Sequence, residues 1–198
     1  MNYQAAKAYI LGRLKADLSE RLTYHSLYHT LDVLQVTGEL CQLENITDHE
    51  TTLLKTAALY HDSGFLISNK NHEQLGCGIA RHALTRFGYT LEEIDRICGM
   101  IMATKVPQNP HNRLEEILCD ADLDYLGRDD FERIGTTLFE ELKYYNILET
   151  ELAWNKMQIG FLNAHTFFTA TNKARREAQK QIHLQALEAW VAAVAARF

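Results

Sequence analysis

The sequence predicts an all-α fold, because its hydrophobic residues follow a helical spacing and few residues interrupt it. Apolar residues recur three and four positions apart along almost the whole chain, as in Leu75, Ile79, Ala83 and Phe87, which is the period of an amphipathic helix. No comparable stretch alternates apolar and polar residues as a half-buried strand does. The 198 residues include only two prolines and ten glycines, so few positions oppose helix formation.

The expected helices are separated by short turns. Asp62-Ser63-Gly64, Pro107 and Gly127 fall between periodic segments, where short loops are expected. The chain contains no internal repeat, low-complexity tract or linker, so residues 1–198 are expected to form a single helical domain. The expected helices cover residues 3–18, 24–43, 48–61, 71–87, 90–103, 111–125, 129–147, 150–164 and 172–196.

The composition excludes several classes of protein. Hydrophobic residues make up 46% and charged residues 23% of the chain, as in soluble globular proteins. A net charge of −6 argues against nucleic acid as a partner, because such binding depends on Lys and Arg neutralising phosphates. No segment has the roughly 20 apolar residues needed to span a bilayer, and residues 1–15 lack the apolar stretch of a signal peptide. Four cysteines without a CxxC pair fit a reducing cytoplasm, so a cytoplasmic location without a membrane partner is expected.

Two histidines stand near the start of the second expected helix. The inward stripe of this helix is expected to be His29, Val33, Val36, Leu40 and Leu43, so His29 should face the core. His25 lies four residues earlier and is expected on roughly the same face. A single inward histidine is more often a hydrogen-bonded core residue than a ligand, so neither residue carries a function by itself.

Two further candidates end the third and sixth expected helices. His61 and Asp62 close one helix, where a carboxylate meets the negative end of the helix dipole and needs a nearby cation or donor. Asp122 lies on the apolar stripe of the other helix, whereas Asp120 and Asp124 are rotated about 200° from it. Two histidines and two aspartates from three helices would form the mixed nitrogen and oxygen shell that suits a divalent metal acting on phosphate.

These residues also resemble a known family. The order His29, then His61-Asp62, then Asp122 resembles the H…HD…D signature of HD-superfamily phosphohydrolases, and the residues around the dipeptide, Leu59 to Gly64, match as well. The resemblance covers about residues 23–127. It implies a helical bundle with a divalent metal ion at its centre (Mn, Fe, Co, Zn or Mg), held by His29, His61, Asp62 and Asp122.

The run Tyr24-His25 followed by His29 resembles the Tyr-His-Asn-x-x-His run of cyclic-nucleotide phosphodiesterases, in which the first histidine protonates the leaving oxygen. Ser26 stands in place of their asparagine, so cyclic-nucleotide specificity is not implied. The acidic residues that follow the HD pair in guanosine tetraphosphate hydrolases are absent as well. The expected substrate is therefore a phosphomonoester or phosphodiester of a nucleotide or a related small phosphate metabolite.

Four more residues are candidates for substrate binding or for support of the ligands. His72 and Glu73 stand where many HD proteins place a His-Glu pair that contacts a second metal or the substrate phosphate, although Glu is also favourable in any first helical turn. Lys105 could reach the phosphate, although Lys is also favoured at a helix C-terminus. Asp120 could support the ligands or cap its helix.

The expected reaction is direct hydrolysis by metal-activated water, with Asp62 as ligand and orienter of the water and His25 as proton donor. A small phosphorylated substrate is the expected partner, and a homo-oligomer is compatible with the sequence. Two alternatives stay open. One is a non-catalytic HD module that senses a metal or nucleotide. The other is an interaction protein that docks a partner on its C-terminal stripe, Ile182, Leu187, Trp190, Val191 and Val194.

Overall fold

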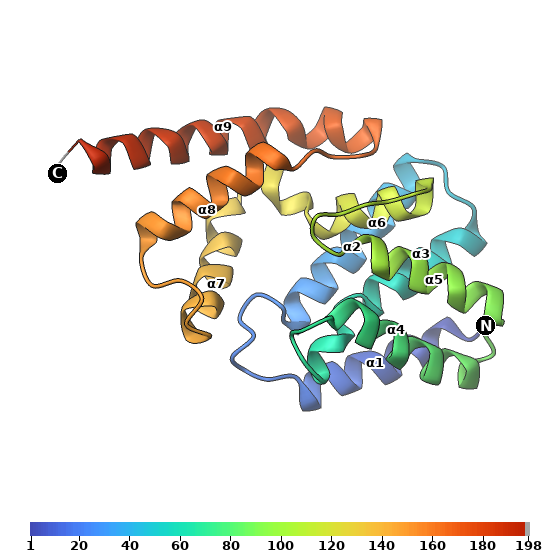
Figure 1. Ribbon diagram of the computed structural model, residues 1–198. Helices are drawn as coiled ribbons and strands as arrows, with labels where there is room; N and C mark the ends of the chain where they lie inside the picture. Colours follow the sequence, from blue (N-terminus) through green and yellow to red (C-terminus); the bar gives the residue numbers. More distant parts are fainter. Residues whose placement is uncertain (197–198) are drawn as a thin grey trace. The chain divides into compact units, whose positions relative to one another are not determined.

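The computed structural model describes residues 1–196 and confirms the all-α fold, with no strand among these residues (Figure 1). None of their helices is both long and apolar enough to cross a membrane. The α-helices are α1 (Tyr3–Asp17), α2 (Leu27–Leu43), α3 (Asp48–Tyr60), α4 (His72–Leu84), α5 (Leu91–Ala103), α6 (Arg113–Asp122), α7 (Phe131–Tyr144), α8 (Glu151–Ala164) and α9 (Ala170–Ala195). Three 3₁₀ turns are η1 (Ser63–Leu66), η2 (Thr85–Phe87) and η3 (Asp124–Gly127).

The chain divides into two compact units, Met1–Asp122 and Leu123–Phe198. The sequence predicts one helical domain over residues 1–198 and carries no signal for this boundary. The reason is physical, since no flexible linker marks it: α6 ends at Asp122 and η3 begins at Asp124.

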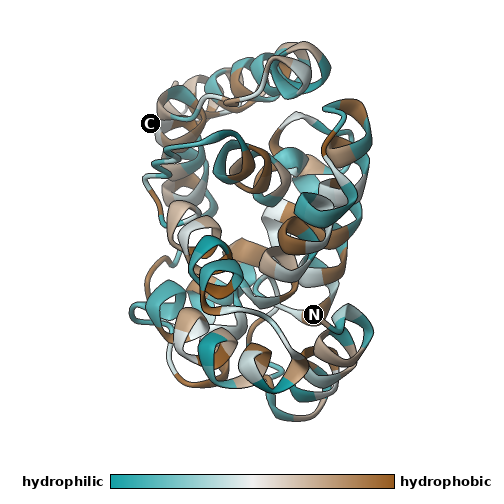
Figure 2. Cartoon of the chain, turned by 90° about the vertical axis from the view of Figure 1, so that its right-hand side faces the viewer, coloured by the Kyte–Doolittle hydropathy of each residue, from teal (hydrophilic) through white to brown (hydrophobic). Residues whose placement is uncertain are grey.

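The first unit is built around α3. This helix packs against α1, α2, α5 and α6, and its residues from Leu53 to Tyr60 are buried except for Lys55. A helix that is apolar on most of its sides belongs in the centre of a bundle. Helices of the chain show apolar and polar residues on the same ribbon, brown and teal in Figure 2, as expected of helices with one face toward a core. The two ends of α3 are therefore fixed by neighbours on several sides.

Helix α2 begins later than the sequence indicated. Ser26 has an extended backbone, with φ −110° and ψ 171°, and caps a helix that starts at Leu27. His25 therefore lies in the preceding loop and not on the first turn, so the expectation that helical spacing aligns it with His29 is wrong. His29, Val33, Val36 and Leu40 are buried as expected. Leu43, which was assigned to the same stripe, is 52% exposed because the helix ends there.

Glycines let α4 and η1 approach the end of α3 closely. A Cβ atom on Gly64 would lie 1.9 Å from the carbonyl oxygen of His72, and one on Gly76 would lie 3.0 Å from the carbonyl oxygen of Tyr60. Helix α4 also lies close to α5, where the Cys77 thiol is 3.5 Å from the carbonyl oxygen of Cys98. Small residues thus allow α4 to place its N-terminus beside His61 and Asp62.

The second unit contains η3, α7, α8 and α9, with α9 packed against α8 and η3. Asp124 is fully buried and accepts hydrogen bonds from Arg176 Nε (2.8 Å) and Asn172 Nδ2 (3.2 Å). It forms a structural pair, one of the roles that its helical phase indicated. Along the C-terminal stripe, Ile182 is exposed, whereas Leu187, Trp190, Val191 and Val194 are half-buried.

Candidate metal centre

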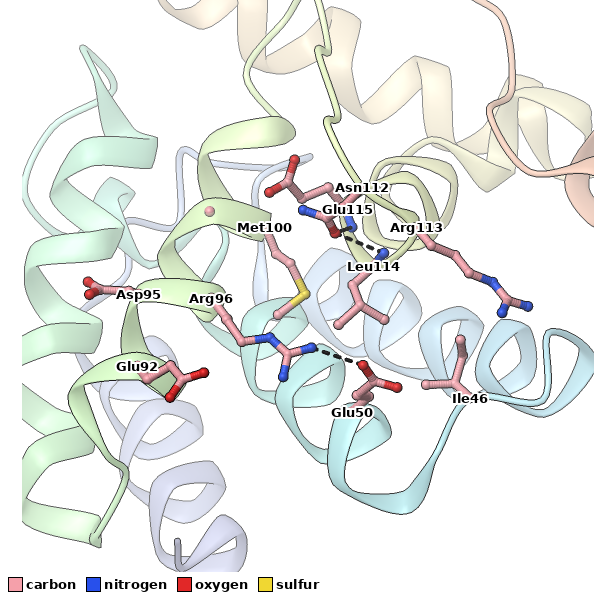
Figure 3. Close-up of a pocket in the computed structure, with 11 residues that line it drawn as sticks. Ile46, Glu50, Glu92, Asp95, Arg96, Met100, Asn112, Arg113, Leu114 and Glu115 are labelled. Atoms are coloured by element: carbon pink, nitrogen blue, oxygen red, sulfur yellow. Dashed lines mark hydrogen bonds and ion pairs between the residues drawn. The ribbon is translucent and has the colours of Figure 1, made fainter.

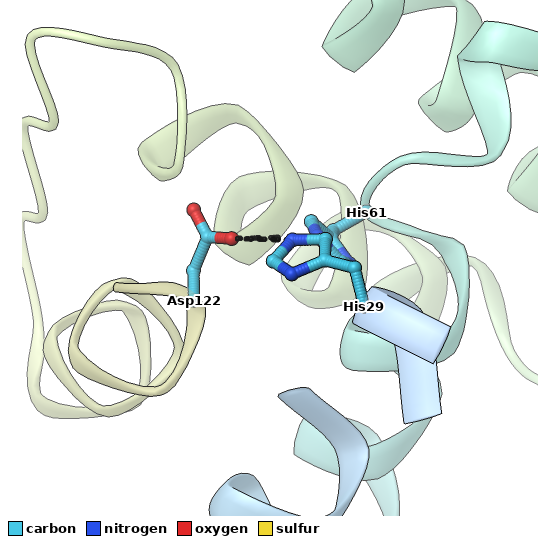
Figure 4. Close-up of side chains that lie close together, drawn as sticks. All are labelled: His29, His61 and Asp122. Carbon is cyan, nitrogen blue, oxygen red and sulfur yellow. Dashed lines mark hydrogen bonds and ion pairs between the residues drawn. The ribbon is translucent and has the colours of Figure 1, made fainter. Parts of the chain in front are cut away.

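Three elements of the first unit bring His29, His61 and Asp122 together (Figure 4). His29 lies in the first turn of α2, His61 directly follows α3, and Asp122 is the last residue of α6. One potential ligand atom from each lies within 4.8 Å of the other two. Asp122 Oδ1 is 3.2 Å from His29 Nε2 and 3.5 Å from His61 Nε2, and the two Nε2 atoms are 3.3 Å apart.

The orientation of the His61 ring is fixed by the backbone of its own helix. Its Nδ1 lies 2.8 Å from the carbonyl oxygen of Ala58. A carbonyl oxygen only accepts hydrogen bonds, so Nδ1 carries a proton and donates it. In the neutral ring Nε2 then carries the lone pair, which faces the cluster. A backbone bond of this kind is how metal-ligating histidines are commonly held.

Asp62 brings a fourth ligand atom to the same place. Its Oδ2 is 3.2 Å from His61 Nε2 and 3.5 Å from His29 Nε2. This oxygen is buried and accepts no hydrogen bond from the described residues. The four atoms of the cluster are two imidazole nitrogens and two carboxylate oxygens. While both rings are neutral, His61 has its proton on Nδ1, so only His29 could donate a proton within the cluster. Such an excess of buried acceptors is compensated either by a proton on an imidazole or by a bound cation.

The pKa values of the cluster follow from the same charge balance. Burial lowers the pKa of the His61 imidazole, but the carboxylates of Asp62 and Asp122 outweigh burial and hold it well above its ordinary value of 6.5. Burial raises the pKa of Asp122, and the imidazoles of His29 and His61 outweigh this and lower it to about 2. The pKa of Asp62 is lowered in the same way. The carboxylates stay ionised and ready to bind a cation.

The donor set fits a divalent transition metal. Two imidazole nitrogens and two carboxylate oxygens are borderline ligands that suit zinc, manganese, iron or cobalt. Both carboxylates are largely buried, with 10% and 12% of their side chains exposed, so their charge needs compensation that solvent does not supply. A metal ion bound here would take the place of the proton that the imidazoles otherwise share with Asp62 and Asp122.

His25 and His72 lie beside the cluster, where both rings contact Phe65 and their centroids are 6.1 Å apart. The His25 ring stacks on Phe65 with a centroid distance of 4.2 Å, and the His72 ring stacks on Phe65 at the same distance. The His25 centroid is 6.4 Å from that of His29. The packing of η1 thus brings His25 beside the cluster, although α2 does not include it.

The His72-Glu73 pair lies next to Oδ1 of Asp62, the oxygen that does not take part in the cluster. His72 Nε2 is 3.6 Å from Asp62 Oδ1 and 3.5 Å from Glu73 Oε1, and its Nδ1 lies 3.3 Å from the carbonyl oxygen of Asn69. Glu73 is buried. Since the two oxygens of Asp62 face different histidines, this carboxylate joins the cluster to the N-terminus of α4.

The other two candidates lie differently. Lys105 is exposed just beyond α5, and its role as a phosphate contact stays a prediction. Asp120 is fully buried within α6, and a supporting role for it stays a prediction as well. Gln108, which the sequence did not indicate, also reaches the cluster, since its Nε2 lies 3.3 Å from Asp122 Oδ2. No motif marks Gln108, because it belongs to an irregular loop.

A pocket of about 780 Å³ lies elsewhere in the first unit, on α3, α5 and the N-terminal end of α6 (Figure 3). Arg96 in this pocket donates to Glu50 at 2.9 Å, and Glu115 accepts from the backbone N–H of His111 at 2.7 Å. The lining includes none of the predicted site residues, and Asp122 lies at the opposite end of α6.

Comparison with known proteins agrees with this geometry. The HD domain family model matches residues 26–124, a segment that contains His29, His61, Asp62 and Asp122. A crystal structure of a predicted HD superfamily hydrolase from an uncultured Thermotogales bacterium superimposes with a TM-score of 0.62 and 18% sequence identity, over 93% of this chain and 91% of that one. No protein of curated function matches the sequence. The family model covers half of the chain and the resemblance in the sequence is confirmed, so this protein belongs to the HD domain family.

Proposed function

We propose that this protein is a metal-dependent phosphohydrolase that cleaves a phosphomonoester or phosphodiester of a nucleotide or a related small phosphate metabolite. The observation that carries the proposal is the cluster of His29, His61 and Asp122, with Asp62 Oδ2 within 3.5 Å of both imidazoles, in the segment that matches the HD family. A metal ion held by these residues would bind the phosphate oxygens of the substrate and a water molecule.

Each side chain of the centre has a proposed role. His29, His61, Asp62 and Asp122 would hold the ion. When bound, a divalent metal supplies charge that stabilises the phosphoryl oxygens and lowers the pKa of a water molecule. Asp62 is proposed to orient that water as well, through Oδ1, which lies 3.6 Å from His72 Nε2.

His25 is the proposed proton donor to the leaving oxygen. The ring is half-buried, lies beside the cluster and is held by stacking on Phe65. An imidazole is suited to this task near neutral pH. His72, held against the other carboxylate oxygen of Asp62, is proposed to contact the substrate phosphate or a second metal ion together with Glu73.

Metal binding is tested with purified wild type, His29→Ala and the matched control His82→Ala, which removes an exposed histidine of α4. Calorimetric titration with Mn²⁺ should give close to one tight site in wild type and in the control. His29→Ala should lose this site, because one of its four ligands is absent. An unchanged affinity in His29→Ala would contradict the ligand assignment.

Hydrolysis is tested on nitrophenyl phosphoesters and on nucleotides, with added Mn²⁺, Mg²⁺, Co²⁺ or Zn²⁺. His25→Ala should keep its metal yet hydrolyse the nucleotide about 10²–10⁴-fold more slowly, since its alkoxide leaving group needs a proton. A nitrophenolate leaves without much protonation and should suffer much less. Equal losses on both substrates would remove the proton-donor role. A metal-loaded wild type that hydrolyses none of the phosphoesters would favour the non-catalytic sensor.

A further inference from the structure

Gln108 lies in the loop between α5 and α6 and reaches the last turn of α6. Its Nε2 is 3.3 Å from Asp122 Oδ2 and 3.2 Å from the carbonyl oxygen of Cys119. Both of these oxygens are acceptors, so the atom between them must be the NH₂ group of the amide, which has two hydrogens to donate. The chemistry of the two neighbours therefore fixes the orientation of the amide.

These two hydrogen bonds lie at the C-terminal end of α6, where the negative charge of Asp122 is otherwise unfavourable. Asp122 ends α6, and the carbonyl groups of the last turn make this the negative end of the helix dipole. Gln108 donates to one of these carbonyls, that of Cys119, and to the carboxylate itself. It satisfies Oδ2, so that Oδ1 alone faces His29 and His61. A carboxylate tied in this way presents one defined oxygen to a metal ion.

The amide oxygen of Gln108, Oε1, indicates that the role of this residue goes beyond stabilising the fold. Gln108 Oε1 is buried and has no hydrogen-bond partner among the described residues. A buried acceptor left without a partner opposes folding. An apolar side chain of similar size at this position would remove that cost, together with the two bonds that Nε2 donates.

The geometry points to Gln108 as a positioning residue that holds Asp122 for metal binding. This inference rests on the proposed function, because it assigns a role toward the same metal centre. Partners that orient a ligand in this way typically change metal affinity about 10–100-fold. The expected effect of removing the amide is therefore weaker metal binding in a protein that stays folded, although Asp122 Oδ2 and the Cys119 carbonyl lose their donor.

The test compares wild type with Gln108→Leu, Gln108→Glu and the control Asn109→Ala, which removes an exposed amide from the neighbouring residue of the same loop. Each protein is titrated with Mn²⁺ by calorimetry, and the metal-free form is unfolded with urea. Gln108→Leu should raise the Kd for Mn²⁺ about 10–100-fold, with a urea midpoint that still leaves the protein fully folded during the titration. Gln108→Glu should raise the Kd at least as much, because a carboxylate cannot donate to Asp122.

Asn109→Ala should leave both quantities unchanged. A Kd for Gln108→Leu equal to that of wild type would overturn the inference and leave the proposed metal centre intact. A rise in Kd accompanied by a urea midpoint so low that Gln108→Leu is partly unfolded during the titration would also overturn it, because the residue would then be structural. If wild type itself binds no Mn²⁺, the proposed function fails and the inference fails with it, a result that differs from the other two.

Discussion

Gly64→Ala and Gly78→Ala should change stability in opposite directions. A Cβ atom on Gly64 would lie 1.9 Å from the carbonyl oxygen of His72, 2.6 Å from its carbonyl carbon and 2.7 Å from its Cα. All three are backbone atoms, so no side chain can turn aside. Gly78 lies on the exposed face of α4, and a Cβ there would meet nothing within 4 Å.

The magnitudes follow from these distances. To reach the 3.4 Å at which ordinary contact begins, η1 and the start of α4 must separate by about 1.5 Å. Overpacking of a well-packed site typically costs about 1–3 kcal/mol, and Gly64→Ala should lie at the upper end because two backbones must move. Gly78→Ala should stabilise by about 0.5–1 kcal/mol, because alanine is the better residue in a helix interior.

Urea unfolding followed by circular dichroism at 25 °C measures both changes on the metal-free protein. A Gly64→Ala variant as stable as wild type would refute this prediction, since η1 and α4 would then not be in such close contact. The displacement also moves His72. Gly64→Ala should therefore lose phosphoesterase activity by about 10²-fold, the typical effect of a 1 Å misplacement, beyond what its unfolded fraction explains.

Two further predictions concern other parts of the chain. Asp124→Ala should destabilise the second unit by about 3 kcal/mol, because Arg176 loses its buried partner. The Kd for Mn²⁺ should stay that of wild type. A lost metal site would show instead that Asp124 belongs to the centre. Burial raises the pKa of Tyr3 to about 12, so its neutral form favours the folded state and stability should fall as pH rises from about 10 through 12. The difference in ultraviolet absorbance between wild type and Tyr3→Phe isolates the signal of Tyr3. This signal should titrate at a higher pH in the folded protein than in urea, and coincident titration would contradict the assignment.

The ligands could be anticipated because helical phase is a local property. His29 and Asp122 stand out as polar residues on apolar stripes, and the HD pair stands at a helix end where a carboxylate is otherwise unfavourable. The structure brings these residues together as the pattern indicated. Phase was less reliable at the helix ends, where His25 was assigned to a turn of α2 that the extended backbone of Ser26 excludes.

The sequence by itself determined the all-α class, the approximate helices and the polar residues that face the core, because hydrogen bonds and hydrophobic spacing within a helix involve residues close in the chain. Only the tertiary structure decided which oxygen of Asp62 faces His61, that Phe65 contacts both His25 and His72, and that Gln108 donates to Asp122. These contacts depend on how helices and loops distant in sequence pack against one another. Their geometry is set by side-chain volume and by hydrogen bonds across elements, which no local period encodes.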